Sequence, residues 1–244
     1  MNNSKKNQKH PMSHNRSLNN TLKMIALALI ATLTFSCSKD DDAPSVEAPT
    51  LAYSTNIEAT FFTAGSSAAP TINWNGEQGT FSLTSAPING LTVNENTGVL
   101  SYAKILPPGE HNLEVTATNS TGSNSTTVTV KNTFQGTFSG LYDGEVDGEI
   151  GSPFYDIEME FHPNGSITGA FIGGSISFNG NWELMEDKVY IEFDSDGSGG
   201  QYSILDEIVI TDESVNIGTT TLYDGYGAEP GQERGDISLC LGDC

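Results

Sequence analysis

The stretch FYDIEMEF, from Phe154 to Phe161, alternates apolar and acidic side chains along its length. Successive side chains of a β-strand point to opposite faces of a sheet, so this pattern predicts a strand with one buried face and one face in water. The inward set is Tyr155, Ile157, Met159 and Phe161, and the outward set is Asp156, Glu158 and Glu160.

The chain on either side repeats this pattern. The turn HPNG, His162 to Gly165, leads into a second strand, and a later run puts Val189, Ile191 and Phe193 on an inward face before the turn DGSGG, Asp196 to Gly200. Short alternating runs separated by Gly, Asn, Asp and Pro turns are typical of all-β domains. The strands expected here are 134–142, 154–161, 166–171, 175–178, 182–184, 189–193, 202–210 and 215–222, with 236–241 as a closing edge.

Sequential hairpins of this kind favour an antiparallel meander. Curling into a small barrel removes exposed strand edges, so residues 133–244 are expected to form an acidic β-barrel, with a second two-sheet sandwich as the alternative. The segments FQGTFSGLYDG (134–144) and FNGNW (178–182) are similar to parts of calycin or lipocalin-like barrels. That resemblance implies a ligand at the barrel mouth, although small barrel interiors are also often filled by side chains.

Residues 50–132 predict a separate β domain with strands near 81–83, 91–93, 99–102, 113–118 and 126–130. Leu113, Val115 and Ala117 fall on one face of their strand, and Val128 and Val130 fall on one face of the next. Alternation of this kind predicts half-buried sheets. The fold class expected for the whole chain is therefore all-β, with a β-sandwich followed by a meander barrel.

The runs 90–102 and 107–123 carry the hallmarks of a known bacterial domain family. These are Gly90 and Leu91, Thr97 and Gly98, and then Val115, Ala117, Asn119 and Gly122. On these residues the domain resembles the putative-Ig and cadherin-like repeats, and the resemblance implies an Ig-like spacer or adhesion module. The aspartate-rich calcium motifs of cadherins are poorly matched, and an ordinary hairpin turn at 94–98 is the simpler interpretation.

The N-terminal 36 residues contain five basic side chains and no acidic one, and they lead into the apolar run MIALALIATLTF, Met24 to Phe35. Twelve apolar residues are too few to span a bilayer core as a helix, which takes about 20. The layout is that of a cleaved signal peptide, residues 1–36.

The stretch LTFSC, Leu33 to Cys37, resembles the lipobox of bacterial lipoproteins, in which the cysteine is acylated and begins the mature chain. The leucine lies four residues before the cysteine instead of the usual three. The alternative is a simple secreted protein with an incidental cysteine. More than one acyl chain is needed for lasting attachment, since each buried methylene contributes about 0.8 kcal/mol.

The tract SKDDD, Ser38 to Asp42, directly follows Cys37. In Gram-negative lipoproteins such a tract resembles the signal for transfer to the exterior face of the outer membrane, whereas the simpler interpretation is a solvated tether. Residues 37–49 are polar and proline-rich, and are expected to form a flexible lipid-anchored linker. The resemblance thus implies an outer-membrane protein facing the cell exterior.

Acidic residues dominate the chain beyond the leader. From Thr133 onward two basic residues stand against 22 acidic ones. Such a surface repels nucleic acid and anionic membranes, so the only membrane contact expected is the lipid anchor, and no nucleic-acid partner is expected.

Several residues are candidates for specific sites, each with a simpler alternative. Cys240 and Cys244 predict a C-terminal disulfide in an oxidising compartment. Asp194, Asp196 and Ser198 have the spacing of the first calcium ligands of an EF-hand loop, but no glutamate follows at the twelfth position, and a hairpin turn is the alternative.

The aromatic residues Trp182, Tyr190, Tyr223 and Tyr226 offer faces for sugar rings, against an alternative of core packing and loop filling. Arg234 to Asp236 reads RGD, which is also explained by chance.

No pattern in the chain points to catalysis. Glu158 and Glu160 are roughly 7 Å apart on one strand face, a separation that suits a glycosidase but also any solvated acidic strand. No Ser-His-Asp order or HExxH motif occurs, and an enzyme is not expected.

The leading hypothesis is a lipid-anchored, non-catalytic binding or adhesion protein for a glycan or protein, without a cofactor apart from the calcium alternative. The others are a surface polysaccharide hydrolase or accessory glycan-binding subunit, and a carrier of a small apolar ligand.

Overall fold

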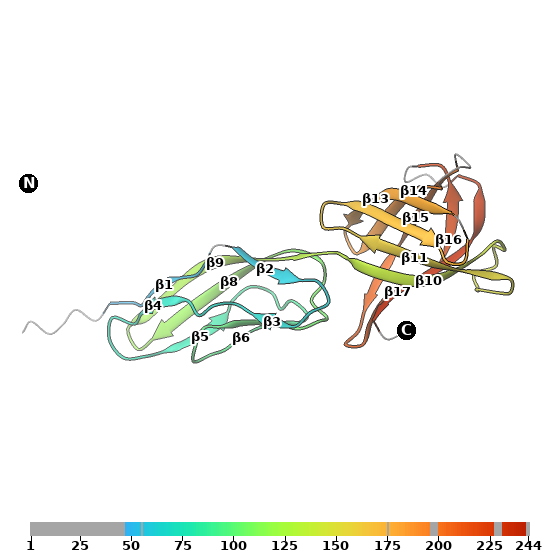
Figure 1. Ribbon diagram of the computed structural model, residues 1–244. Coiled ribbons are helices and arrows are strands. Elements are labelled where there is room, and N and C mark those ends of the chain that lie inside the picture. The colour runs from blue at the N-terminus through green and yellow to red at the C-terminus, as the bar shows by residue number, and fades with distance from the viewer. Residues whose placement is uncertain (1–46, 55, 175, 196–199, 227–230, 243–244) are drawn as a thin grey trace, which may run out of the picture. The chain divides into compact units, whose positions relative to one another are not determined.

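The computed structural model describes residues 47–54, 56–174, 176–195, 200–226 and 231–242 (Figure 1). These residues form strands, turns and loops only, which confirms the all-β prediction. None of the described segments is a helix long and apolar enough to cross a bilayer.

The strands up to residue 133 form three small sheets. Their bounds are β1 (Thr50–Ala52), β2 (Asn56–Thr60), β3 (Gly65–Ser66), β4 (Thr71–Asn73), β5 (Thr80–Leu83), β6 (Leu91–Val93), β7 (Leu100–Tyr102), β8 (Gly109–Asn119) and β9 (Gly122–Thr133). The orders are β2-β9-β8-β5, β3-β7-β6 and β1-β4, and β2 runs parallel to β9.

The two larger sheets share one hydrophobic core, as a sandwich requires. Phe81, Leu113 and Val128 come from the four-stranded sheet, and Leu91 and Leu100 come from the three-stranded sheet. The predicted inward set of β8 and β9 is buried in this core. The turn at 94–98 is a hairpin in which the side-chain oxygen of Asn94 accepts hydrogen bonds from the backbone of residues 96 and 97, both 3.0 Å long.

The remaining strands form a closed eight-stranded antiparallel barrel in chain order (Figure 1). This confirms the meander and excludes the second sandwich. The strands are β10 (Gly136–Asp143), β11 (Phe154–Phe161), β12 (Ser166–Phe171), β13 (Ser177–Met185), β14 (Lys188–Ser195), β15 (Gln201–Ile210), β16 (Ser214–Asp224) and β17 (Glu233–Gly242).

Two details of the predicted strands were wrong. Residues 177–178 and 182–184 belong to one strand, and Gly180 lies within it and not in a turn: a Cβ at this position would lie 2.0 Å from the Glu192 carbonyl oxygen of the neighbouring strand. Glycine here allows close approach of two backbones. The last strand is not an edge either, because β17 pairs with both β16 and β10 and so closes the barrel.

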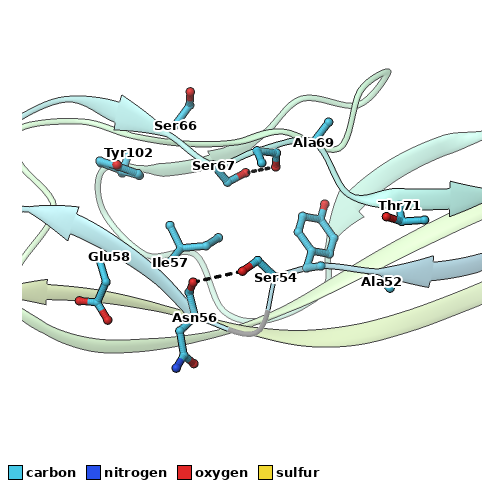
Figure 2. Close-up of a pocket in the computed structure, with 12 residues that line it drawn as sticks. Ala52, Ser54, Asn56, Ile57, Glu58, Ser66, Ser67, Ala69, Thr71 and Tyr102 are labelled. Carbon is cyan, nitrogen blue, oxygen red and sulfur yellow. Dashed lines mark hydrogen bonds between the residues drawn. The ribbon is translucent and has the colours of Figure 1, made fainter.

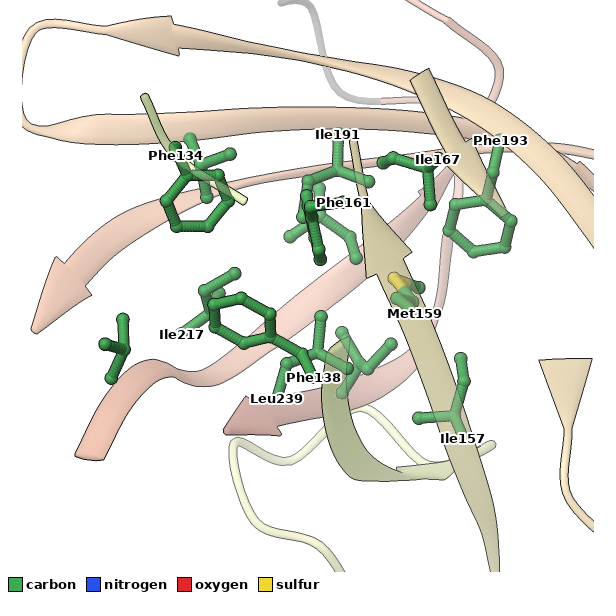
Figure 3. Close-up of a cluster of buried hydrophobic side chains, with 14 of the residues drawn as sticks. Phe134, Phe138, Ile157, Met159, Phe161, Ile167, Ile191, Phe193, Ile217 and Leu239 are labelled. Carbon is green, nitrogen blue, oxygen red and sulfur yellow. The ribbon is translucent and has the colours of Figure 1, made fainter. Parts of the chain in front are cut away.

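Apolar side chains fill the barrel interior, as Figure 3 shows. Phe138 and Phe161 are at most 1% exposed, with ring centroids 5.0 Å apart. Phe134 lies 5.4 Å from Phe138 and 5.2 Å from Trp182, and these rings close the end of the barrel that contains the 162–165 turn. Interiors packed in this way leave no channel through the barrel.

Candidate functional site

The opposite end of the barrel is open and apolar. It is the end at which β10, β12, β14 and β16 finish, and a hollow of about 560 Å³ lies there, which we call the mouth. Its walls come from six of the eight strands and the 172–176 loop. They are formed by Tyr142, Tyr155, Phe171, Ile172, Gly173, Gly174, Ile176, Phe193, Tyr202 and Leu222.

A continuous series of aromatic rings supports the floor and walls of the mouth. Neighbouring centroids are 4.6–6.4 Å apart, within the range of favourable ring packing. The series runs Tyr155, Tyr142, Phe171, Phe178, Phe193 and Tyr202, and each residue belongs to a different strand. The rings hold one another in place, so the floor and walls of the mouth are built before any ligand arrives.

Part of the apolar lining of the mouth is exposed to solvent, and it adjoins a further exposed apolar side chain. Tyr155, Ile172 and Ile176 are 57%, 53% and 44% exposed, and all three line the mouth. Phe154, at the same end of β11, is also exposed. Contiguous exposed apolar side chains beside a hollow are typical of a binding surface.

A charged pair borders the mouth on the β16 and β17 side. Arg234 and Asp224 are 2.5 Å apart and line a second hollow of about 620 Å³ together with Tyr142 and Tyr202. The hydrogen bond from Arg234 holds the pKa of Asp224 below its usual value, and the same bond raises the pKa of Arg234. The guanidinium is thus already paired.

Tyr142 connects the apolar and charged parts of this end. Its hydroxyl donates to the carbonyl oxygen of Arg234 at 3.0 Å. Burial raises the pKa of Tyr142, and the nearby Tyr202 and Asp143 raise it further, whereas Arg234 lowers it. Tyr142 therefore stays a neutral hydrogen-bonding ring at physiological pH.

Two buried carboxylates hold the 144–153 loop beside the mouth. Asp143 and Asp236 are cross-strand partners, 2% and 0% exposed. Asp236 accepts from the backbone N–H groups of Asp147 at 2.9 Å and Gly148 at 2.6 Å, and from the Thr221 hydroxyl at 3.3 Å.

Asp143 makes the matching contacts at the two ends of the loop. Its carboxylate accepts from the backbone N–H groups of Glu145 at 2.9 Å and Gly151 at 2.5 Å. Buried carboxylates are tolerated only with such donors. The pair therefore sets the conformation of the loop.

The same contacts decide the role of the RGD sequence. Arg234 to Asp236 lies within β17, not in a turn. Asp236 is fully buried under the loop, and Arg234 is paired with Asp224. The tripeptide is thus part of the barrel wall and is not presented for recognition.

The aromatic residues chosen from the sequence lie in separate places. Trp182 packs against the core and donates its Nε1–H to the carbonyl oxygen of His162 at 2.9 Å. Tyr190 points outward as predicted but is only 7% exposed, and its hydroxyl donates to Glu192. Tyr223 is half-buried, and the hydroxyl of Tyr226 donates to Asp194 at 2.5 Å. None of the four lines the mouth.

The mouth aromatics were not singled out from the sequence. Tyr142, Tyr155, Phe171 and Tyr202 each lie in the first or last two residues of their strands. A signal for them exists in the sequence: in this meander the ends of the even-numbered strands and the starts of the odd-numbered strands meet at one end of the barrel, so inward aromatic residues at those positions converge.

The calcium and cysteine predictions fall mainly on other parts of the chain. Asp196, Ser198, Cys37 and Cys244 lie outside the described residues. Within the described residues, no group of three or more His, Cys, Asp or Glu side chains is placed to hold a metal. Cys240 is disulfide-bonded. Glu158 and Glu160 are exposed on the outer face of β11, as the alternation predicts.

A smaller hollow of about 400 Å³ lies in the sandwich, beside β2 and β3 (Figure 2). Its lining is mainly small and polar, and the hydroxyls of Ser54 and Ser67 donate to nearby carbonyl oxygens. Tyr53 donates to the carbonyl oxygen of Gly98, and burial raises its pKa to about 12. These hydroxyl groups already donate to backbone carbonyl oxygens of the sandwich, so the hollow offers a ligand fewer free hydrogen-bond donors and less apolar surface than the mouth.

Comparisons with known proteins add little. The chain matches no protein-family model and no curated protein. It is similar to the crystal structure of a quinonprotein alcohol dehydrogenase-like protein from Bacteroides thetaiotaomicron, with 15% identity and a TM-score of 0.27. The match covers 78% of this chain and 61% of that chain, so this chain spans about three-fifths of the neighbour's length. The likeness is too slight to support any conclusion about fold or function.

Proposed function

We propose that the protein is a lipid-anchored, non-catalytic binding module of the cell surface, and that its barrel takes up an apolar group of the ligand at the mouth. One observation carries this proposal: an apolar hollow with aromatic walls opens at one end of an otherwise filled barrel, and exposed apolar side chains extend it. Such hollows are the usual binding sites of barrels.

The sequence supports the location. The apolar run ending at Phe35, the cysteine at position 37 and the acidic tract after it are the features of a surface lipoprotein. With the chain attached through Cys37, residues 38–46 are left as the tether, because the carbonyl oxygens of Glu47 and Ala48 already accept hydrogen bonds from Thr121 and Asn75 of the sandwich.

A neutral fluorescent dye tests the mouth directly. N-phenyl-1-naphthylamine is expected to bind the purified chain from Ser38 onward, and Ile172→Asp is expected to weaken this binding by about tenfold, because a carboxylate in the wall disfavours an apolar ligand. Val209→Asp is the matched control, since Val209 is 52% exposed and lies on β15 away from the mouth. Equal losses in both variants, or no dye binding, would refute the proposal.

The anchor is tested by metabolic labelling with radioactive palmitate. The full chain is expected to incorporate label and to fractionate with membranes, whereas Cys37→Ala is expected to lose the label and to be released. Label that persists in the variant would show that acylation takes place at another residue and would contradict the assignment to Cys37.

A carrier of a small apolar molecule is the second candidate, and the same hollow favours it. A volume of about 560 Å³ is in the range of small-molecule sites. The two candidates differ in whether groups outside the hollow contribute to binding.

A further inference from the structure

Acidic side chains surround the apolar mouth. Among the described residues at this end of the barrel, six exposed carboxylates, which we call the rim, are Glu145, Asp147, Glu149, Asp156, Asp194 and Glu233. The only basic residue described there is Arg234, whose charge is met by Asp224. A ligand that reaches past the hollow therefore meets negative charge.

The rim is placed by the structure and not left to loose loops. Glu145 and Glu149 are in the loop held by Asp143 and Asp236. Asp156 adjoins the wall, since its carbonyl oxygen accepts from the backbone N–H of Ile172 at 2.7 Å. Charges held at fixed positions around a hollow add both attraction and orientation.

We infer that the ligand is a basic segment of a protein partner that inserts one apolar side chain into the mouth and places lysine or arginine residues against the rim. This inference rests on the proposed function of the mouth. A small molecule confined to the hollow would contact its apolar lining but would leave the rim and the exposed side chain of Phe154 without contacts. An anionic ligand is disfavoured by the rim and by the prior pairing of Arg234.

Three peptides separate the contribution of an aromatic side chain in the mouth from that of basic side chains at the rim. They are Ac-KRKWKRK-NH₂, its alanine analogue Ac-KRKAKRK-NH₂ and the neutral Ac-SGSWSGS-NH₂, titrated into the chain from Ser38 onward at 50 mM NaCl. The basic tryptophan peptide is expected to bind at least tenfold more tightly than either of the others, because a buried aromatic anchor and several rim contacts each contribute. Its advantage over the neutral peptide is expected to vanish near 0.5 M salt, where charges are screened.

Variants of the rim provide the matched control. Removing three rim charges in E145Q/E149Q/D156N is expected to lower the affinity for the basic tryptophan peptide by about tenfold and to leave the affinity for the neutral peptide unchanged. The control variant D187N/D212N/E213Q removes three charges that are exposed at the closed end of the barrel. It is expected to leave the affinity for both peptides unchanged.

The outcomes distinguish this inference from the proposed function. If the neutral peptide or free indole binds as tightly as the basic peptide, the mouth is a site but the partner is not a basic segment. If the alanine analogue binds as tightly as the tryptophan peptide, the mouth is not used and both proposals fail. Binding of a neutral oligosaccharide in place of all three peptides would assign the surface to a glycan and overturn the inference.

Discussion

Replacing Phe138 by alanine is expected to lower the free energy of unfolding of the barrel by about 3–5 kcal/mol. Phe138 is fully buried, and its ring packs against those of Phe134 and Phe161 at the closed end (Figure 3). Removing the ring creates a cavity that surrounding strands cannot fill, because closure of the barrel fixes their spacing.

Urea unfolding followed by tryptophan fluorescence measures this loss in one part of the chain. Trp182 packs against the barrel core and Trp74 packs against Phe81 in the sandwich, so a Trp74→Phe background reports the barrel alone. Phe154→Ala is the control, since Phe154 is 50% exposed, and its cost is expected to be near 0.5 kcal/mol. Similar losses in the two variants would contradict the packed interior.

Replacing Asp236 by alanine is expected to cost about 2–4 kcal/mol and to release the 144–153 loop. The substitution removes an acceptor from two backbone N–H groups and one hydroxyl, and hydrogen bonds to a charged group contribute about 1.5–3 kcal/mol each. The loop is exposed to solvent, so water replaces part of the lost bonding and the net loss is smaller than the sum.

Amide hydrogen exchange reads out the loop specifically. In Asp236→Ala the amides of Asp147 and Gly148 are expected to lose protection, while amides in the middle of β13 keep theirs. Asp212→Ala, at an exposed position of the opposite end, is expected to leave both regions unchanged. Full protection at residues 147 and 148 in the Asp236 variant would show that the loop is held by other contacts.

The barrel was predictable because its alternation is regular. Ile157, Met159, Phe161, Val189, Ile191 and Phe193 are all at most 1% exposed, as their positions in the alternation require. The strand break at 179–181 was wrong because Asn-Gly is a strong local turn signal. At Gly180 the close approach of the β14 backbone at Glu192 requires a residue without a side chain, and this requirement overrides the turn signal. The contact lies outside the few residues that a local turn signal covers.

The candidate site was harder to predict for a related reason. Tyr190 and Tyr226 are candidates for ligand contact on the sequence alone. Their availability depends on neighbouring side chains, because the hydroxyl of Tyr190 donates to Glu192 and that of Tyr226 donates to Asp194. Tyr142 and Tyr202 look like ordinary core residues in the sequence. They form a wall because the end of β10 and the start of β15 lie at the same end of the barrel. The buried pair Asp143 and Asp236 could not be recognised either, because most of its partners are backbone N–H groups of the 144–153 loop, which no side-chain pattern marks.

The most direct test of the mouth is a methyl NMR titration of the chain from Ser38 onward with N-acetyltryptophanamide, a neutral ring compound. Binding in the mouth is expected to shift the δ-methyl signals of Ile172, Ile176 and Leu222, which line it, and to leave the methyl signals of Leu205 and Val209 on the outer wall unchanged. Shifts confined to the outer wall or to the sandwich, or no shifts at millimolar ligand, would contradict binding in the mouth.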